Sequence, residues 1–339
     1  MQELFELVRR LVDINSVTGS ETACSAFLES RLRAAGFVVE TQEVSPGRAN
    51  IIATLGTPEV VLSTHIDTVR PYFPSSEDAN WIRGRGACDA KGILACQMIA
   101  AEQLAREGVG DLGLLFVVGE ESQSDGARAA NECPRGSRYL IVGEPTDNRL
   151  VTATKGVLQL RVRARGRAAH SAYPELGESA IEKLLDALNS LRAMPLPSDP
   201  ELGPATMNIG TISGGVAPNV VPESAEAMML FRTVDDCSAL MARIGALLDG
   251  RVEYEFERFA AATRLQTVEG FETSTVSFVS DVGNLGRWGQ PLLIGPGSIQ
   301  VAHTPEERVS KAELVQAVKL YRGLVRELKL RARTEGGSQ

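Results

Sequence analysis

The chain has 339 residues, of which 43% are hydrophobic and 23% are charged. This is the composition of an ordinary globular protein, and the length favours two domains. The formal net charge of −8 argues against a nucleic-acid partner, and the longest apolar runs fall far short of the roughly 20 residues of a membrane span, so we expect no membrane partner.

The N-terminal segment and the cysteines indicate the compartment. The segment MQELFELVRRLVDINS mixes acidic residues into an amphipathic pattern, which predicts a helix of the folded protein and not a signal peptide. The five cysteines are scattered and form no Cys-x-x-Cys pair, as expected for free thiols in a reducing compartment. We therefore expect a cytoplasmic protein in which histidine and carboxylate side chains hold any metal.

The first part of the chain alternates predicted helices and strands. Residues 18–37 predict a helix that begins at a capping box of Thr18 and Glu21 and stops at Gly36. Alternation of strands and helices is typical of an α/β domain with a largely parallel sheet between helices. Further strands are predicted within 50–56, 59–67, 112–122 and 138–146, and a helix is predicted within 90–108.

The pattern changes near residue 157. Residues 156–172 alternate apolar and polar side chains, as a half-exposed antiparallel strand does. We expect an inserted α+β domain of the ferredoxin-like type over 157–262, with helices on one face of its sheet. After the first strand it contains a helix, two strands, a helix and a strand, at 177–194, 205–215, 224–234, 236–250 and 251–259.

The first type of pattern returns after this insertion. A strand is predicted at 290–297 and a last helix at 311–328, and the polar tail 332–339 is expected to be disordered. We therefore predict a larger, discontinuous domain that comprises 1–156 and 263–339.

Candidate metal ligands follow four predicted strands of the larger domain. His65 ends one strand, and Asp67 lies two residues further on, where an extended chain directs both side chains to the same side. Sites in open α/β sheets form at the carboxyl ends of strands. The other candidates are Glu120 and Glu121, Glu144, His303 and, on a loop before a helix, Asp89.

These residue types suit a particular chemistry. Two imidazoles and several carboxylates, without thiolates, favour zinc, or cobalt or manganese in its place. Carboxylates can bridge, so five ligands can hold two ions about 3.5–4 Å apart, which polarise a carbonyl and activate a water. Of Glu120 and Glu121, one can bind metal while the other stays free as general base. Asp67 would accept the second N–H of His65 and fix its tautomer.

Each of these residues taken alone has a plainer interpretation. His65 and Asp67 could form a structural hydrogen-bonded pair, and the adjacent glutamates could begin a solvated helix. Asp89 could be an N-cap, Glu144 a turn residue and His303 a structural histidine. Their joint occurrence after four strands favours the metal site.

Five sequence blocks together resemble the signature motifs of the M20 family of di-zinc metallopeptidases and amidohydrolases. The blocks are HIDTV, GRGACDAKG, GEES, GEPT and AHTPEE, and the resemblance covers essentially the whole chain. The family includes acetylornithine deacetylase, succinyl-diaminopimelate desuccinylase, aminoacylase and glutamate carboxypeptidase. The resemblance implies two zinc ions, a lid domain and a homodimer formed through that lid.

The resemblance also implies a role for each candidate ligand. His65 and Glu144 would bind one zinc ion, Glu121 and His303 would bind the other, and Asp89 would bridge them. It further implies a cis peptide bond directly after the bridging aspartate.

The remaining site residues take their roles from the same resemblance. Glu120 would be the general base, and Asp67 would orient its neighbouring histidine. His170 matches a lid histidine that reaches the partner subunit's active site, where it would stabilise the tetrahedral oxyanion. Asn219 and Arg232 match lid positions that contact the substrate carboxylate.

The substrate is less clearly indicated. The block GPGSIQVAH resembles that of acetylornithine deacetylases, which favours deacetylation of N-acetyl-ornithine or a related N-acyl amino acid. Desuccinylases and hydrolases that release lysine from a carrier protein usually carry Gly-Thr-Ser-Asp, of which this chain keeps Ser280 and Asp281. These activities and dipeptidase activity are the alternatives, and a catalytically silent ligand-binding relative is an alternative of another class.

Overall fold

The computed structural model describes residues 1–336, and it divides the chain into two compact units. The first comprises Met1–Thr152, Leu265–Ser274 and Ser280–Gln339, and the second comprises Ala153–Arg264 and Thr275–Val279. The main division thus falls close to the predicted limits of 157 and 262. The return of the chain to the second unit at Thr275–Val279 was not predicted.

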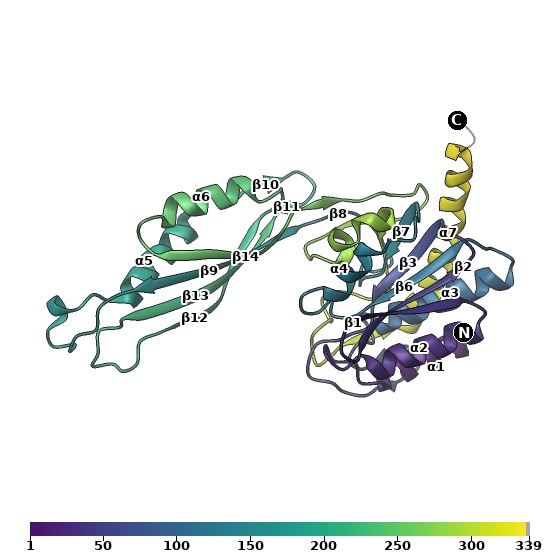
Figure 1. Cartoon of the computed structure of the whole chain (residues 1–339), viewed down its shortest axis with the longest axis horizontal. Coiled ribbons are helices and arrows are strands. Elements are labelled where there is room, and N and C mark those ends of the chain that lie inside the picture. Colours follow the sequence, from purple (N-terminus) through teal and green to yellow (C-terminus); the bar gives the residue numbers. More distant parts are fainter. Residues whose placement is uncertain (337–339) are drawn as a thin grey trace. The chain divides into compact units, whose positions relative to one another are not determined.

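The first unit is built on a six-stranded mixed sheet (Figure 1). Its order is β1-β2-β6-β3-β7-β17, in which β6, β3, β7 and β17 are parallel and β1, β2 and β6 are antiparallel neighbours. Every residue of β3 and β6 is buried, as in parallel strands with both faces covered. The strands are β1 Val38–Ser45, β2 Arg48–Leu55, β3 Val60–His65, β6 Leu112–Val117, β7 Tyr139–Val142 and β17 Gln290–Leu293.

Helices lie on both faces of this sheet. Alternate strand residues such as Leu62 and Leu114 share one hydrophobic core with α1, α2, α3 and α7. On the other side α4 packs against β1, β2 and β6. This is the predicted α/β architecture. The helices are α1 Gln2–Asp13, α2 Thr22–Ala34, α3 Lys91–Arg106, α4 Asp125–Glu132 and α7 Lys311–Gly336.

Three local predictions differ from the structure. The capping box is wrong: Glu21 itself precedes α2 without capping it, and the Thr18 hydroxyl donates to Asp67 instead. The strand β1 was not predicted, because only Val39 of its eight residues is fully buried and the apolar signal is weak. The tail expected to be disordered begins inside α7, which continues to Gly336, and residues 337–339 lie outside those described.

Small sheets complete the first unit and its connections. A three-stranded sheet in the order β18-β5-β4 joins segments from distant parts of the sequence. Another, in the order β15-β8-β16, contains or adjoins three of the four positions at which the chain passes from one unit to the other. The strands are β4 Ser76–Glu77, β5 Trp81–Arg83, β18 Arg308–Ser310, β8 Leu150–Thr154, β15 Thr263–Arg264 and β16 Thr273–Val276. Short 3-10 turns lie at Asp281–Asn284 and Gly286–Trp288.

The second unit is the predicted ferredoxin-like α+β fold. Its antiparallel sheet has the order β12-β13-β9-β14, and α5 and α6 pack on one face (Figure 1). Residues of β13 alternate strictly between buried and partly exposed, because only one sheet face is covered. The elements are β9 Gly156–Arg165, α5 Ala180–Ala193, β12 Thr206–Gly214, β13 Ser224–Thr233, α6 Ser238–Leu248 and β14 Glu253–Ala260. A 3-10 turn at Pro174–Leu176 and a small hairpin, β10 Ser198–Asp199 with β11 Gly203–Pro204, lie in its connections.

Every helix within residues 1–336 is too short or too polar to span a lipid bilayer.

Candidate metal centre

Four neighbouring parallel strands deliver the predicted ligands to one edge of the sheet. His65 is the last residue of β3, and Glu120 follows β6 after a short turn. Glu144 lies two residues beyond β7, and His303 lies in the loop between β17 and β18. Because β6, β3, β7 and β17 are adjacent and parallel, their carboxyl ends meet.

Asp89 lies at the centre of the resulting cluster. Its Oδ1 is 3.0 Å from Nε2 of His65, and its Oδ2 is 3.3 Å from Nε2 of His303. Nε2 of His303 is also 3.0 Å from Oε1 of Glu121. Potential ligand atoms of His65, Asp89 and Glu121 all lie within 4.8 Å of one another. One carboxylate oxygen for each of two imidazoles is the arrangement that a bridging ligand needs.

The backbone around Asp89 also agrees with the resemblance. The peptide bond between Asp89 and Ala90 is cis, as predicted, and α3 begins directly afterwards at Lys91. The thiol of the preceding residue, Cys88, donates to the carbonyl of Ser298, so it is not one of the ligand atoms of the cluster.

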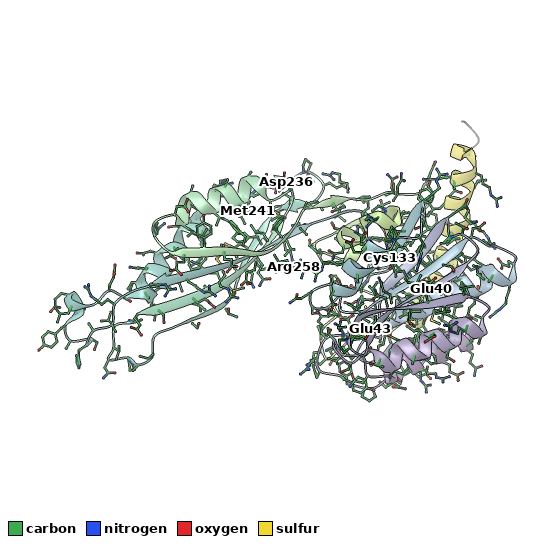
Figure 2. All side chains as sticks on the ribbon, viewed as in Figure 1. Glu40, Glu43, Cys133, Asp236, Met241 and Arg258 are labelled. Atoms are coloured by element: carbon green, nitrogen blue, oxygen red, sulfur yellow. The ribbon has the colours of Figure 1, made fainter. Side chains whose placement is uncertain are left out.

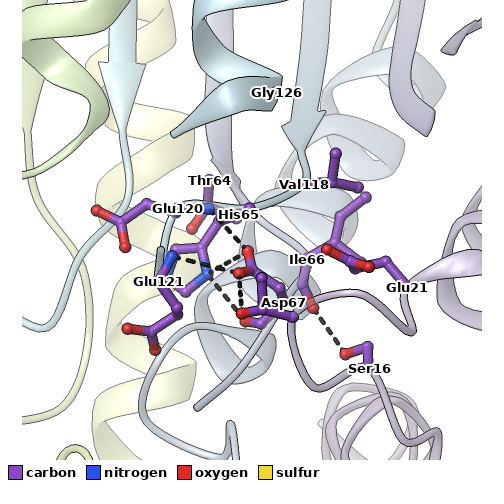
Figure 3. A network of polar contacts seen from close by, with 12 residues as sticks. Ser16, Glu21, Thr64, His65, Ile66, Asp67, Val118, Glu120, Glu121 and Gly126 are labelled. Atoms are coloured by element: carbon purple, nitrogen blue, oxygen red, sulfur yellow. Dashed lines mark hydrogen bonds and ion pairs between the residues drawn. The ribbon is translucent and has the colours of Figure 1, made fainter. Parts of the chain in front are cut away.

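Asp67 contacts His65 differently from the prediction (Figure 3). The nearest acceptor of the imidazole Nδ1 is the main-chain carbonyl of Asp67 at 2.9 Å, whereas the carboxylate Oδ1 is 3.6 Å away. The carboxylate instead accepts the N–H groups of Glu120 and Glu121, at 3.1 and 3.2 Å, and the Thr18 hydroxyl at 2.7 Å. Asp67 therefore orients the imidazole through its backbone and holds the turn that carries both glutamates through its side chain.

The two glutamates of this turn have different surroundings. Glu121 pairs with His303, whereas the carboxylate of Glu120 makes no hydrogen bond or ion pair with any residue of the described chain. Figure 3 shows the two carboxylates directed apart. One glutamate is thus engaged with a candidate ligand while the other is free, as the two-role interpretation requires.

Burial and crowding of negative charge shift the carboxyl groups. Burial raises the pKa of Glu120 well above 4.5, and the negative charge of Asp281 raises it further, against an opposing contribution from His65. The pKa of Glu144 is raised in the same way, first by burial and then by the negative charge of Asp89. Both groups therefore lie where added positive charge would strongly favour the ionised form.

The pKa values of the two imidazoles are raised as well, which favours their charged form. Hydrogen bonds to Asp89 and Glu121 raise the pKa of His303 to about 10. Burial lowers the pKa of His65, but the neighbouring carboxylates outweigh burial and raise it well above 6.5. The cluster therefore attracts cations.

The donor set fits a divalent metal. Five buried or largely buried carboxylates surround two imidazoles, and so much uncompensated negative charge is costly in a protein interior. Imidazole nitrogen with carboxylate oxygen, and no thiolate, is a set that zinc, cobalt and manganese accept. The carboxylates are those of Asp67, Asp89, Glu120, Glu121 and Glu144.

The predicted lid residues all lie in the second unit, at two separate places. His170 is exposed and forms an isolated β-bridge with Val220, and the N–H of Ser171 donates to the carbonyl of Asn219. Arg232 lies near the C-terminal end of β13, whereas Asn219 precedes the start of that strand. The structure therefore brings His170 and Asn219 together and separates them from Arg232.

Arg232 is half-buried and has no acidic partner among the described residues. Burial lowers its pKa, and the positive charge of Arg258 on β14 lowers it further. Arg258 is marked on this sheet in Figure 2. Two neighbouring arginines, one of them unpaired and partly desolvated, form a natural place for an anion.

Sequence reasoning missed three residues that build the centre. Arg85 and Glu307 form a buried ion pair beside the Asp89 loop, and the buried Asp281, named from the sequence only as part of a substrate-type motif, makes the largest charged contribution to the raised pKa of Glu120. Glu307 lies in the block AHTPEE, four residues after His303, so an acidic residue at that spacing was the available signal. Nothing local in the sequence indicates that its carboxylate reaches the other loop.

Comparison with known proteins identifies the family. Residues 152–251 match the family description "Peptidase dimerisation domain". A peptidase M20 domain-containing protein of Schizosaccharomyces pombe is 38% identical over 335 residues, covering 95% of this chain and 84% of the relative. A probable carboxypeptidase of Aspergillus clavatus is 39% identical over 369 residues, covering 95% and 82%.

Solved structures share the fold. The aminopeptidase PepT of Bacillus cereus has a TM-score of 0.80 and 21% identity, covering 97% of this chain and 98% of that one. The YxeP protein of Bacillus subtilis, described as a dinuclear metal-binding peptidase of the M20 family, has a TM-score of 0.68 and 16% identity, covering 96% of both chains. This chain therefore belongs to the M20 family of peptidases, and within it to the hydrolases that carry a dimerisation domain.

Proposed function

We propose that this protein hydrolyses the amide bond of N-acyl amino acids with the help of two bound metal ions, and that N-acetyl-ornithine or a close relative is its substrate. The observation that carries the proposal is the environment of Asp89. Its two oxygens face two different histidines, while the carboxylate of the neighbouring Glu120 is free of partners among the described residues. A site that held metal only for structural purposes would have no use for a free carboxylate.

The metal ions are assigned to particular residues. His65 and Glu144 would hold one ion, Glu121 and His303 would hold the other, and Asp89 would be shared by both. When bound, zinc, or cobalt or manganese in its place, polarises the amide carbonyl and lowers the pKa of a water.

Glu120 moves the proton. It takes one from the attacking water and passes it to the nitrogen of the departing amine, so that the amine leaves together with a carboxylic acid, which then gives its remaining proton to solvent. Its main-chain N–H is held by Asp67, which fixes the turn from which the carboxylate projects. Positive charge from the metals offsets the burial that raises the pKa of Glu120, and the residue is then available as a base near neutral pH.

The lid residues recognise the substrate. Arg232, unpaired among the described residues and half-buried, binds the carboxylate of the amino acid, and Asn219 contacts the same carboxylate. His170 is an oxyanion donor: its Nδ1 accepts the N–H of Ala172 at 3.1 Å, which leaves Nε2 to carry the proton.

The spacing within the lid supports a homodimer. Backbone from Ser224 to Arg232 covers about 26 Å at a rise of ~3.3 Å per residue, and His170 lies beyond the Ser224 end. One small substrate therefore cannot contact both groups of a single lid. We therefore assign His170 to the active site of the partner subunit, as the family resemblance implies, and Asn219, which lies beside it, to the same site.

A second candidate is release of a C-terminal residue from a peptide. The relative that is named a probable carboxypeptidase and is 39% identical favours it. The chemistry at Glu120 would be unchanged, and Arg232 would bind the carboxylate of the C-terminal residue. The two candidate reactions differ only in the acyl group of the amide that is cleaved.

The decisive experiment measures amine release by the zinc- or cobalt-loaded protein from a panel of amides. The panel contains N-acetyl-ornithine, N-acetyl-citrulline, N-succinyl-diaminopimelate, N-acetyl-methionine and a dipeptide. We expect turnover of an acetylated amino acid that falls about 10²–10⁴-fold in Glu120→Ala at unchanged metal content. Preferential turnover of the dipeptide would establish the second candidate. A protein that binds two metals and hydrolyses none of the panel would contradict both and favour a silent ligand-binding relative.

A further inference from the structure

The loop that carries Asp89 is held by a buried side chain from the far end of the sequence. Glu307 lies between His303 and β18, and its side chain has no exposed surface. Its Oε1 accepts the main-chain N–H groups of Gly86, Cys88 and Asp89, at 2.9, 3.2 and 3.1 Å. Three donors of one short loop thus converge on a single oxygen.

The second oxygen of Glu307 is also engaged. Nη1 of Arg85 donates to Oε2 at 2.5 Å, and Nε of the same arginine donates to the carbonyl of Pro71 at 3.1 Å. The guanidinium also stacks on Phe73, 4.9 Å from the ring centroid. Both partners of this ion pair are almost completely buried. Since both carboxylate oxygens are occupied by donors, Glu307 is not itself a candidate metal ligand.

The same contacts join the two loops that carry candidate ligands. The N–H of Gly84 donates to the carbonyl of Glu307 at 3.2 Å, and β18 then pairs with β5. The Cys88 thiol donates to the carbonyl of Ser298 on the His303 side. The position of Asp89 relative to His303 is therefore set mainly by the contacts of Glu307, together with the contact of the Cys88 thiol.

We propose that Glu307 is a positioning residue of the metal centre, which fixes the loop of Asp89 so that each of its oxygens faces one of the two metal positions. The proposal rests on the metal centre described under the proposed function. Carboxylates that act behind the ligands typically influence metal affinity about 10–100-fold. The N–H of Asp89 is directly bound, so a change at Glu307 moves the ligand itself and not only its surroundings.

A purely structural role makes a different prediction. If Glu307 only stabilises the fold, its replacement lowers the melting temperature of the metal-free and zinc-loaded protein equally, and zinc affinity stays unchanged. If it positions Asp89, zinc binds more weakly, and the stabilisation that zinc confers shrinks.

The test compares Glu307→Gln with Glu306→Gln in the full-length protein. Glu306 is the neighbouring residue, and its side chain is 79% exposed, so the control removes the same charge without touching the loop. Glutamine at 307 keeps the shape but places an amide donor or a weaker acceptor against Arg85 and the loop. Zinc dissociation constants are measured by competition with a chromophoric chelator, and the visible spectrum of the cobalt-loaded protein reports ligand geometry.

We expect the zinc affinity of Glu307→Gln to fall about 10–100-fold, with a changed cobalt spectrum and activity that recovers at high zinc. Glu306→Gln should match the wild type in all three. Zinc affinity of Glu307→Gln within twofold of the wild type, together with a lower melting temperature, would overturn the proposal.

A second variant covers the case in which Glu307→Gln does not fold. Glu307→Asp keeps the charge opposite Arg85 but is too short to reach all three N–H groups, and we expect weakened zinc binding in a folded protein. Wild-type affinity in this variant would count against the proposal. A wild-type protein that binds no zinc at all would remove the metal centre itself, an outcome distinct from failure of the Glu307 assignment alone.

Discussion

The two units of this protein arrange their charged side chains in opposite ways. Around His65, buried carboxylates outnumber cationic groups, and the carboxylate of Glu120 has no hydrogen-bond or ion-pair partner within residues 1–336. On the open sheet face of the second unit, Arg161, Arg163 and Arg165 are each paired with a glutamate. Surface pairs of this kind contribute little to stability, but they neutralise the charge of these three arginines.

In each unit, the charged side chains that lack partners of opposite charge mark the candidate functional site. Excess negative charge in the first unit calls for bound cations, and the unpaired Arg232 in the second calls for an anion. A buried ionic group that lacks a partner is costly, so an unbalanced one indicates a ligand that the protein itself does not supply. The predictions below test this difference, beginning with the largest expected effect.

Replacing Asp89 by alanine should abolish the metal centre. The residue contacts both imidazoles, so its loss removes the one group shared by the two proposed metal positions. We expect activity below detection, zinc content well under two ions per chain and no increase of melting temperature on addition of zinc. Arg163→Ala in the second unit is the control and should leave all three unchanged. Retention of two tightly bound zinc ions in Asp89→Ala would contradict the bridging role.

The local sequence was sufficient to place the candidate ligands at the ends of strands. The run VVLSTH is apolar up to its last residues, so a buried strand ending at His65 followed from composition alone. The same reasoning placed Glu120 and Glu144 after β6 and β7, because short apolar runs in this alternating context form parallel strands. Where such parallel strands are neighbours in the sheet, their carboxyl ends meet, and the side chains that follow them come together.

The remaining features depend on contacts that local patterns do not encode. Glu307 meets Gly86 across 221 residues, and no periodicity in either segment indicates this. Thr18 and Glu21 have the spacing of a capping box, but tertiary partners, Asp67 and Arg48, take their side chains instead. Local preference was overridden wherever a buried charge had to be satisfied.

Replacing His170 by alanine should affect catalysis without affecting metal. Removal of one oxyanion donor typically lowers kcat about 10²–10³-fold, and His170 lies in the second unit, remote along the chain from every candidate ligand. Zinc affinity and melting temperature should remain those of the wild type. Mixing His170→Ala with Glu120→Ala subunits provides the sharper test. Heterodimers should recover activity if the histidine acts on the partner subunit's site, and they should recover none if it acts on its own.

Replacing Arg232 by methionine should weaken substrate binding selectively. A charge-assisted hydrogen bond contributes about 1.5–3 kcal/mol, so KM for a substrate with a free carboxylate should rise roughly 10–100-fold. The methyl ester of the same substrate, which lacks the charge, should be affected little. Comparing kcat/KM for acid and ester in the two proteins measures the difference. An equal loss for both substrates would indicate that Arg232 supports the lid and does not recognise the carboxylate.

The smallest effect concerns protons released when zinc binds. The pKa of His303 is raised from 6.5 to about 10 in the metal-free protein, so its contacts with Asp89 and Glu121 stabilise that form fully below pH 6.5 and are lost as pH rises through about 10. Zinc requires the neutral imidazole, and binding at pH 8 must therefore displace this proton. Zinc titrations by calorimetry in two buffers of different ionisation enthalpy give the number released. We expect His303→Ala to release about one proton fewer than the wild type, whereas His170→Ala in the second unit should release the same number. Equal release by all three proteins would mean that His303 is neutral before metal binds, and the charge imbalance of the centre would then be larger still.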